Sequence, residues 1–193
     1  MWQKMWSFAV VLKKAKNQRR HIFTNTEIID QIKAVIEKRG HKVIGCSDEE
    51  IQALTTAQCV DYLPELYRQL LKETGKTIDW FFLGHSAACY ELHSYRNEFL
   101  QEELSIPGLL VPSDIFVFMS CQGVDWWFFR TKTDDTAIYG WSEFEPGFWK
   151  AAPNLAEYLT KALNKTFRPK PAEQYFIYDP AQDQFLPLGT AYY

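Results

Sequence analysis

The sequence contains only four cysteines, and no two of them form a Cys-x-x-Cys motif. This pattern excludes the disulfide framework of a small secreted domain and the paired cysteines of a zinc ribbon. We therefore expect reduced, mostly buried thiols in a cytoplasmic protein. The four residues are Cys46, Cys59, Cys89 and Cys121.

Long hydrophobic runs are missing as well. The longest apolar run near the start, from Trp6 to Leu12, has seven residues, whereas a membrane-spanning helix needs about 20. Lys13 and Lys14 follow this run directly, and no small-residue cleavage site of a secretory signal comes after them. The sequence thus predicts a cytoplasmic protein that does not bind a membrane.

Acidic residues are absent from the first 26 positions, which carry six lysines and arginines and therefore a charge of +6. The remaining residues hold 15 basic and 24 acidic side chains, so their charge is −9. We expect residues 1–23 to form a basic leader ahead of the folded domain. The acidic body argues against nucleic-acid binding, because phosphates require a basic surface. It fits a basic protein partner instead.

The motifs of common enzyme classes are also missing, since there is no phosphate loop, dinucleotide glycine fingerprint or Gly-x-Ser-x-Gly elbow. His85, Cys89 and His93 follow one another at a spacing of four, which would place them on one face of a helix. His85 and His93 would then lie about 12 Å apart along the axis, too far to bind one ion together. No further ligand is indicated, so the sequence predicts neither a metal site nor a cofactor.

Two other catalytic hypotheses are open. Cys121 precedes Gly123 in a predicted turn and could act as a nucleophile, so a small hydrolase that uses Cys121 or His85 and His93 is an alternative. Several loop carboxylates could form an acid–base pair, but we expect them to be solvated acids near a hairpin tip. These carboxylates belong to Asp134, Asp135, Glu143 and Glu145.

Aromatic residues, by contrast, are abundant. They make up 16% of the chain and favour β-strands. In the run Trp126-Trp127-Phe128-Phe129, alternate side chains point to opposite faces of a strand. The predicted sheet is therefore either covered on both faces, which is the more common arrangement, or has one exposed aromatic face. An exposed Trp would be a binding anchor. In the next strand, the small residues Gly140 and Ser142 would let another element approach closely.

Local patterns predict helices that are separated from a cluster of strands. Thr24-x-x-Glu27 and Ser47-x-x-Glu50 are capping boxes that begin two helices, and Gly40 ends the first. A third helix begins at Pro64 and ends at Gly75. The later predictions are a strand at residues 77–83, a helix at 87–104, strands at 114–119, 125–131 and 137–144, a helix after Asn154, and a hairpin at 175–178 and 184–188.

This order of elements favours an α+β fold over a parallel sheet built from βαβ units. We expect N-terminal helices and an antiparallel, mostly meander sheet flanked by helices. The expected organisation is a leader at residues 1–23, an α+β domain at 24–165, and a linker with a C-terminal hairpin at 166–193, packed on the same domain.

Two blocks of the sequence resemble a known family. The first block is Glu49-Glu50-Ile51-x-x-Leu54 followed by Leu63-Pro64-Glu65-x-Tyr67-x-x-Leu70-Leu71-x-x-x-Gly75. The second is Pro112-Ser113-Asp114-Ile115-Phe116-Val117-Phe118 followed by Gln122-Gly123-Val124-x-Trp126-x-Phe128. Over residues 27–164 the chain resembles the SUKH superfamily of Smi/Knr-type domains. It departs from the family's pattern after Gly75, where an Asn-Gly-rich segment is common and is missing here.

The resemblance implies a binding function. Members of this superfamily are mainly bacterial immunity proteins that bind and neutralise polymorphic toxins, often nucleases, and others are regulatory interaction domains. None of the matched residues is catalytic in the family. We therefore expect a non-enzymatic protein with a protein partner, for which a basic toxin domain is the leading candidate and a regulatory scaffold role the alternative.

The charges and the predicted turns, rather than a family motif, indicate which residues meet the partner. An acidic surface would steer the protein onto a basic cleft and occlude it. The residues predicted to bind the partner are Asp125, Asp134, Asp135, Glu143 and Glu145, with Trp126 or Trp141 as the aromatic anchor.

Overall fold

The computed structural model describes residues 23–103, 108–165 and 175–188. The predicted leader, except Phe23, and the predicted linker at 166–174 lie outside these residues. Five α-helices and one short 3-10 helix are described in addition to the strands. The helices are α2 (Asn25–Lys38), α3 (Asp48–Ala57), α4 (Glu65–Thr74), η1 (Ile78–Trp80), α5 (Leu92–Glu103) and α6 (Leu155–Leu163).

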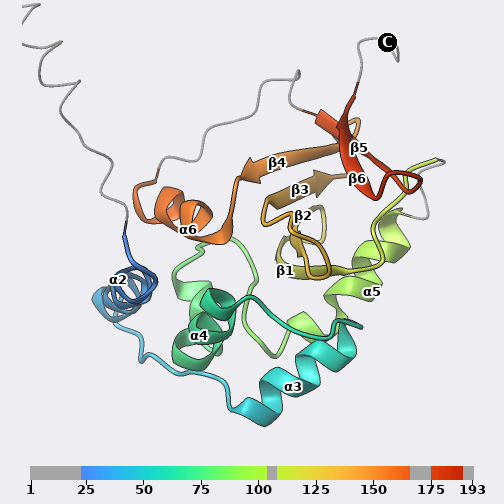
Figure 1. Ribbon diagram of the computed structural model, residues 1–193. Helices are drawn as coiled ribbons and strands as arrows, with labels where there is room; N and C mark the ends of the chain where they lie inside the picture. Colours follow the sequence, from blue (N-terminus) through green and yellow to red (C-terminus); the bar gives the residue numbers. More distant parts are fainter. Residues whose placement is uncertain (1–22, 104–107, 166–174, 189–193) are drawn as a thin grey trace, which may run out of the picture.

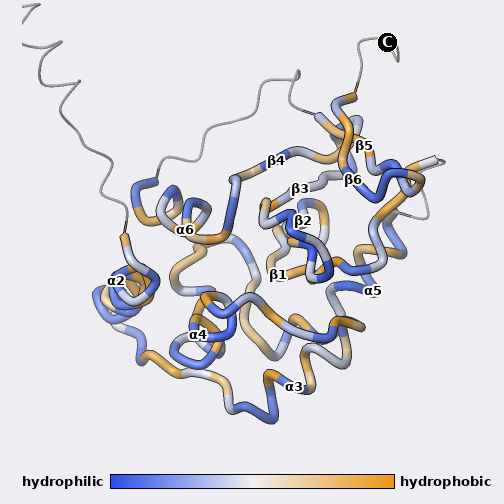
Figure 2. The backbone as a smooth tube through the Cα atoms, viewed as in Figure 1, coloured by the Kyte–Doolittle hydropathy of each residue, from blue (hydrophilic) through white to orange (hydrophobic). Residues whose placement is uncertain are grey.

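The first helices begin where the sequence predicts. The Thr24 hydroxyl accepts a hydrogen bond from the Glu27 backbone N–H, and the Glu27 carboxylate accepts one from the Thr24 N–H. Ser47 and Glu50 make the same reciprocal pair at the start of α3. Hydrophobic and hydrophilic positions alternate along α2 and α4 (Figure 2), as expected for helices with one buried face. Within the described part of the chain, no helix is both long and apolar enough to cross a membrane.

The strands form one antiparallel meander, in which each strand pairs with the next along the chain. This confirms the predicted α+β fold. The C-terminal hairpin is confirmed too, and it continues the sheet because β5 pairs with β4. The strands are β1 (Ile115–Cys121), β2 (Asp125–Arg130), β3 (Ile138–Ser142), β4 (Phe148–Ala152), β5 (Tyr175–Asp179) and β6 (Gln184–Pro187).

The structure differs from the predicted elements between residues 77 and 91 and in the strand that follows β3. Residues 77–83 contain η1 and turns instead of a strand. A strand would place Ile78, Trp80 and Phe82 on one face, but Ile78 and Phe82 are buried and Trp80 is exposed. The helix predicted from residue 87 begins only at Leu92. The preceding residues form turns in which the Asp79 carboxylate accepts a hydrogen bond from the Ala87 N–H at 2.5 Å. Strand β4 is not predicted from the sequence at all.

Both faces of the sheet are covered. On one face, Phe118 of β1 packs edge-on against Tyr158 of α6, with ring centroids 5.5 Å apart. On the other face, Phe99 of α5 contacts Trp126, and Phe185 of the β5–β6 hairpin stacks on Tyr139 at 4.0 Å. Figure 1 shows the sheet between α4 and α6 on one side and α5 on the other. The aromatic strands are therefore core strands.

Candidate partner-binding surface

Neither tryptophan predicted as an anchor is accessible. Trp126 and Trp141 are each 1% exposed. Their rings lie 6.0 and 5.5 Å from that of Phe99, because α5 covers this face of the sheet. The prediction that Trp126 or Trp141 presents an indole to a partner is therefore wrong for this structure.

The five predicted acidic residues separate into two groups. Asp125 lies opposite Ser142 in the β2–β3 register, so it is close to Glu143 and Glu145 in the β3–β4 turn. The other group lies in the β2–β3 connection at the far end of the strands. One strand of this length spans about 17 Å, so the two groups cannot form one compact contact. The second group consists of Asp134 and Asp135.

Asp135 has a structural role in its connection. Its carboxylate accepts hydrogen bonds from the Ala137 N–H at 3.0 Å and from the Tyr139 hydroxyl at 2.8 Å. Burial and this hydrogen bond both raise the pKa of Tyr139. Asp134 beside it is exposed. The carboxylate of Asp135 is thus already engaged within the chain, whereas that of Asp134 faces solvent.

The β3–β4 turn presents an aromatic side chain that the sequence analysis missed. Phe144 is 78% exposed, the highest value among the exposed large hydrophobic residues of the described chain, and it lies between Glu143 and Glu145. The sequence predicts a strand that ends at residue 144 and so includes Phe144. The dipeptide Pro146-Gly147 is a turn signal that could have shown that the strand ends earlier.

The turn holds Phe144 in place through its backbone. The Phe144 N–H donates to the Ser142 hydroxyl at 3.4 Å, and the Glu145 N–H donates to the Ser142 carbonyl at 3.1 Å. The Glu145 carboxylate accepts a hydrogen bond from the hydroxyl of Tyr175 on β5. We refer to Asp125, Glu143, Phe144 and Glu145 as the acidic turn surface.

The composition of the acidic turn surface suits protein recognition. An exposed aromatic ring can fill an apolar depression on a partner, and the neighbouring carboxylates favour a partner with positive charge around that depression. Because hydrogen bonds already restrain the backbone of the turn, less conformational entropy is lost when it binds. The surface can therefore combine one aromatic anchor with charge complementarity.

The histidines and cysteine predicted to share a helix face do not do so. His85 and Cys89 lie in the turns before α5, and His93 is an exposed residue on that helix. Across residues 23–103, 108–165 and 175–188, no three His, Cys, Asp or Glu side chains are grouped so that they could hold a metal ion. The histidine–cysteine pattern therefore marks no metal centre in the described chain.

Cys121, the second catalytic candidate, is half-buried at the end of β1. Its thiol donates a hydrogen bond to the Gly84 carbonyl at 3.4 Å. Burial and the nearby Asp125 carboxylate raise the pKa of this thiol. A raised pKa decreases the fraction of reactive thiolate at neutral pH. The surroundings of Cys121 are thus the opposite of those that activate a cysteine nucleophile.

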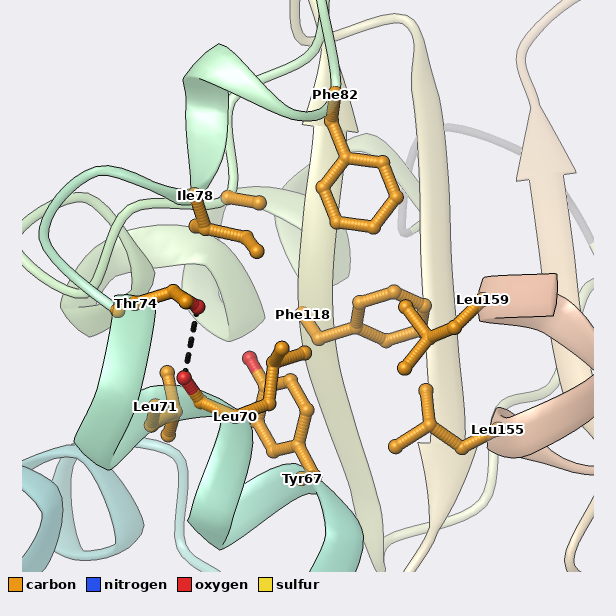
Figure 3. Close-up of a pocket in the computed structure, with 11 residues that line it drawn as sticks. Tyr67, Leu70, Leu71, Thr74, Ile78, Phe82, Phe118, Leu155 and Leu159 are labelled. Carbon is orange, nitrogen blue, oxygen red and sulfur yellow. Dashed lines mark hydrogen bonds between the residues drawn. The ribbon is translucent and has the colours of Figure 1, made fainter. Parts of the chain in front are cut away.

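An enclosed hollow in the core is too small for a ligand. It has a volume of about 10 Å³ and is bordered by α4, η1, β1 and α6 (Figure 3). Tyr67, Phe118 and Leu159 line it, and the hydroxyl of Thr74 at its edge bonds to the Leu70 carbonyl. A space of this size holds about one water molecule. We interpret it as a packing gap and not as a substrate site.

Comparison with known proteins identifies the family. A family model described as SUKH_6, SMI1-KNR4 cell-wall, matches residues 61–159, which is more than half of the chain. The match contains the Leu63–Gly75 and Pro112–Phe128 motifs, and the Glu49–Leu54 motif lies before it. A search of curated proteins finds no match. The family match, together with the α+β fold and its meander sheet, shows that this chain belongs to the SUKH (SMI1-KNR4) family.

Proposed function

We propose that this chain is a non-enzymatic, cytoplasmic immunity protein that binds a basic toxin domain through the acidic turn surface. The observation that carries this proposal is Phe144, which is 78% exposed between two glutamates in a hydrogen-bonded turn. Single exposed apolar side chains are common on protein surfaces, but an aromatic ring held in a restrained turn between carboxylates is well suited to anchor an interface. Membership of the SUKH family fits such a role.

The proposed mechanism is steric occlusion guided by charge. The carboxylates of Asp125, Glu143 and Glu145 steer the protein onto a positively charged cleft, where the ring of Phe144 enters an apolar depression. Long-range attraction of this kind mainly accelerates association, whereas a desolvated aromatic anchor mainly slows dissociation. The bound immunity protein then blocks access of the substrate to the cleft.

Glu143 and Glu145 contribute differently in this mechanism. Glu143 is exposed, and its carboxylate is free to turn toward a partner. Glu145 is half-buried and already accepts a hydrogen bond from Tyr175. Replacement of Glu143 therefore removes a contact without disturbing the turn, whereas replacement of Glu145 also loosens the link between the turn and β5.

The test first searches the neighbouring open reading frames for a polymorphic toxin and then co-expresses the toxin domain found there with this chain. The wild-type chain is expected to restore growth and to bind the purified toxin domain. Phe144→Ala should weaken the affinity about 30-fold, which corresponds to the roughly 2 kcal/mol of a hot-spot residue. Calorimetry gives the dissociation constant, and the growth assay shows whether protection is lost in parallel.

A matched control is Tyr62→Ala. Tyr62 is 53% exposed in the link between α3 and α4 and does not belong to the acidic turn surface. Its replacement should leave both affinity and protection unchanged. Equal losses from Phe144→Ala and Tyr62→Ala would contradict the assignment of the surface. Binding without protection would favour a regulatory scaffold domain, and absence of both would overturn the immunity role.

A further inference from the structure

Two of the four thiols meet in the core, although they are far apart in the sequence. Cys46 lies in the link between α2 and α3, and Cys89 lies in the connection between α4 and α5. Both are buried, with 6% and 4% of their surface exposed. Cys59, by contrast, is exposed, and Cys121 is half-buried.

Backbone hydrogen bonds hold both cysteines at the C-terminal end of α4. The Cys46 N–H donates to the Leu71 carbonyl at 2.9 Å, and the Cys89 N–H donates to the Gly75 carbonyl at 2.8 Å. Gly75 itself donates to the same Leu71 carbonyl. The two segments that carry the thiols are therefore attached to the last turn of α4 and to its capping glycine.

The absence of a side chain at Gly75 provides the space that the Cys46 sulfur occupies. A Cβ atom at this position would lie 2.4 Å from the Sγ of Cys46, so the sulfur occupies the place of a side chain. The thiols of Cys46 and Cys89 interact with each other. This contact raises the pKa of Cys46 and lowers that of Cys89.

We propose that Cys46 and Cys89 are a redox pair that forms an intramolecular disulfide when a peroxide oxidises the protein. Cys89 loses its proton and its sulfur attacks one peroxide oxygen; the O–O bond breaks, and the products are a Cys89 sulfenic acid and a hydroxide that takes up the released proton to become water. The Cys46 sulfur then attacks the Cys89 sulfur, an S–S bond forms, and the hydroxyl group leaves as water with the Cys46 proton. Two thiols lose two electrons, and one hydrogen peroxide becomes two water molecules.

The disulfide would connect two surface segments across the end of α4. Ile44, two residues before Cys46, and Tyr90, directly after Cys89, are both exposed. A covalent bond between the thiols would restrict movement of these segments relative to each other. The acidic turn surface lies on the β3–β4 turn and contains neither cysteine, so the redox pair and the proposed toxin binding can be tested independently.

The experiment treats the full chain with hydrogen peroxide, blocks the remaining thiols by alkylation and maps the digest by mass spectrometry without reduction. The expected product is a cross-linked peptide pair that contains Cys46 and Cys89, with the number of titratable thiols decreasing from four to two. The urea midpoint of the oxidised chain should rise and should return after reduction, because a cross-link restrains the unfolded chain.

Two variants distinguish the mechanism from accidental oxidation. Cys46→Ala should abolish the cross-link and leave a Cys89 sulfenic acid that dimedone labels, whereas Cys59→Ala should form the same cross-link as the wild type. Circular dichroism checks that both variants fold. Cross-links that instead contain Cys59 or Cys121 would overturn the proposal. Retention of both buried thiols at peroxide concentrations that oxidise Cys59 would overturn it as well.

Discussion

Arg130, at the end of β2, carries a buried positive charge that is fully paired. Its guanidinium donates two hydrogen bonds to the Asp114 carboxylate, at 2.9 and 2.8 Å, and others to the Asp183 carbonyl and carboxylate, each at 2.7 Å. Burial disfavours the charge, but the hydrogen bonds to Asp114 and Asp183 outweigh it and raise the pKa of Arg130. This one residue therefore ties the β5–β6 hairpin to β1 and β2.

Replacement of Arg130 should destabilise the protein strongly. Arg130→Met leaves the buried carboxylate of Asp114 without its main partner, and loss of one member of a buried pair costs about 3–5 kcal/mol. The measurement is the free energy of unfolding from urea titration. Arg68→Met is the control, because the Arg68–Asp48 pair is exposed to solvent and should contribute less than about 1 kcal/mol. Similar losses in the two variants would contradict this interpretation.

Individual residues of the acidic turn surface explain why the site was only partly predictable. Charge and predicted turns were enough to select the carboxylates of Asp125, Glu143 and Glu145 as candidate partner contacts. Phe144 was missed because its exposure depends on where β3 ends. The burial of Trp126 could not be read from its own strand, since both faces of that strand are aromatic. Only the packing of Phe99 against it decided which of the two readings is correct.

The pairing of β3 with β4 requires a glycine at position 140. Gly140 pairs with Trp127 on one side and with Trp149 on the other. A Cβ at this position would lie 2.3 Å from the indole of Trp149. The expectation that a small residue here allows a close approach is thus confirmed, and the approaching group is the side chain of the neighbouring strand.

Gly140→Ala should lower the free energy of unfolding by about 1–3 kcal/mol, the usual cost of overpacking a core. Trp149→Leu in the same chain should recover much of this loss, because the clash is with the indole. Gly123→Ala provides the control: its cost arises from a positive φ of 72° with no atom close to the added Cβ. The destabilisation by Gly123→Ala should therefore simply add to that of Trp149→Leu when both substitutions are combined. If the losses of Gly140→Ala and Trp149→Leu simply add in the double variant, the clash with the indole is not the cause of the destabilisation.

Helix starts marked by a capping box were easier to predict than the segments between helices. A capping box needs only residues three positions apart, so Thr24-x-x-Glu27 and Ser47-x-x-Glu50 were sufficient. Residues 77–83 resemble a strand in composition, but Asp79 bonds to Ala87 beyond that range, and Ser86 bridges to Ser120 of β1. Long-range bonds of this kind override local preference for strand.

For the whole molecule, the separation of charge predicts a salt-dependent encounter with the partner. The chain after its first 26 residues carries a charge of −9, and exposed charges are screened beyond about 10 Å at 0.1 M salt. The association rate with the proposed toxin domain should therefore fall steeply between low and high salt, while the dissociation rate changes little. Stopped-flow measurements across a salt series test this directly.

The location of the acidic residues makes this prediction specific. Glu143→Gln should decrease the salt dependence of the association rate, because it removes a charge from the acidic turn surface. Asp134→Asn changes the net charge by the same amount at the opposite end of the sheet and should have a smaller effect. Equal effects of the two substitutions would show that net charge, and not the acidic turn surface, controls the encounter.

Features that depend on neighbouring residues are predictable without the structure: the capped helices, most of the strands, the α+β class and the family resemblance. These follow from hydrogen bonds and side-chain periodicity within a few positions. The tertiary structure alone decided which aromatic residues are buried, which acidic residues share a surface, and that Cys46 meets Cys89. Each of these depends on contacts between distant segments, so no local pattern specifies it.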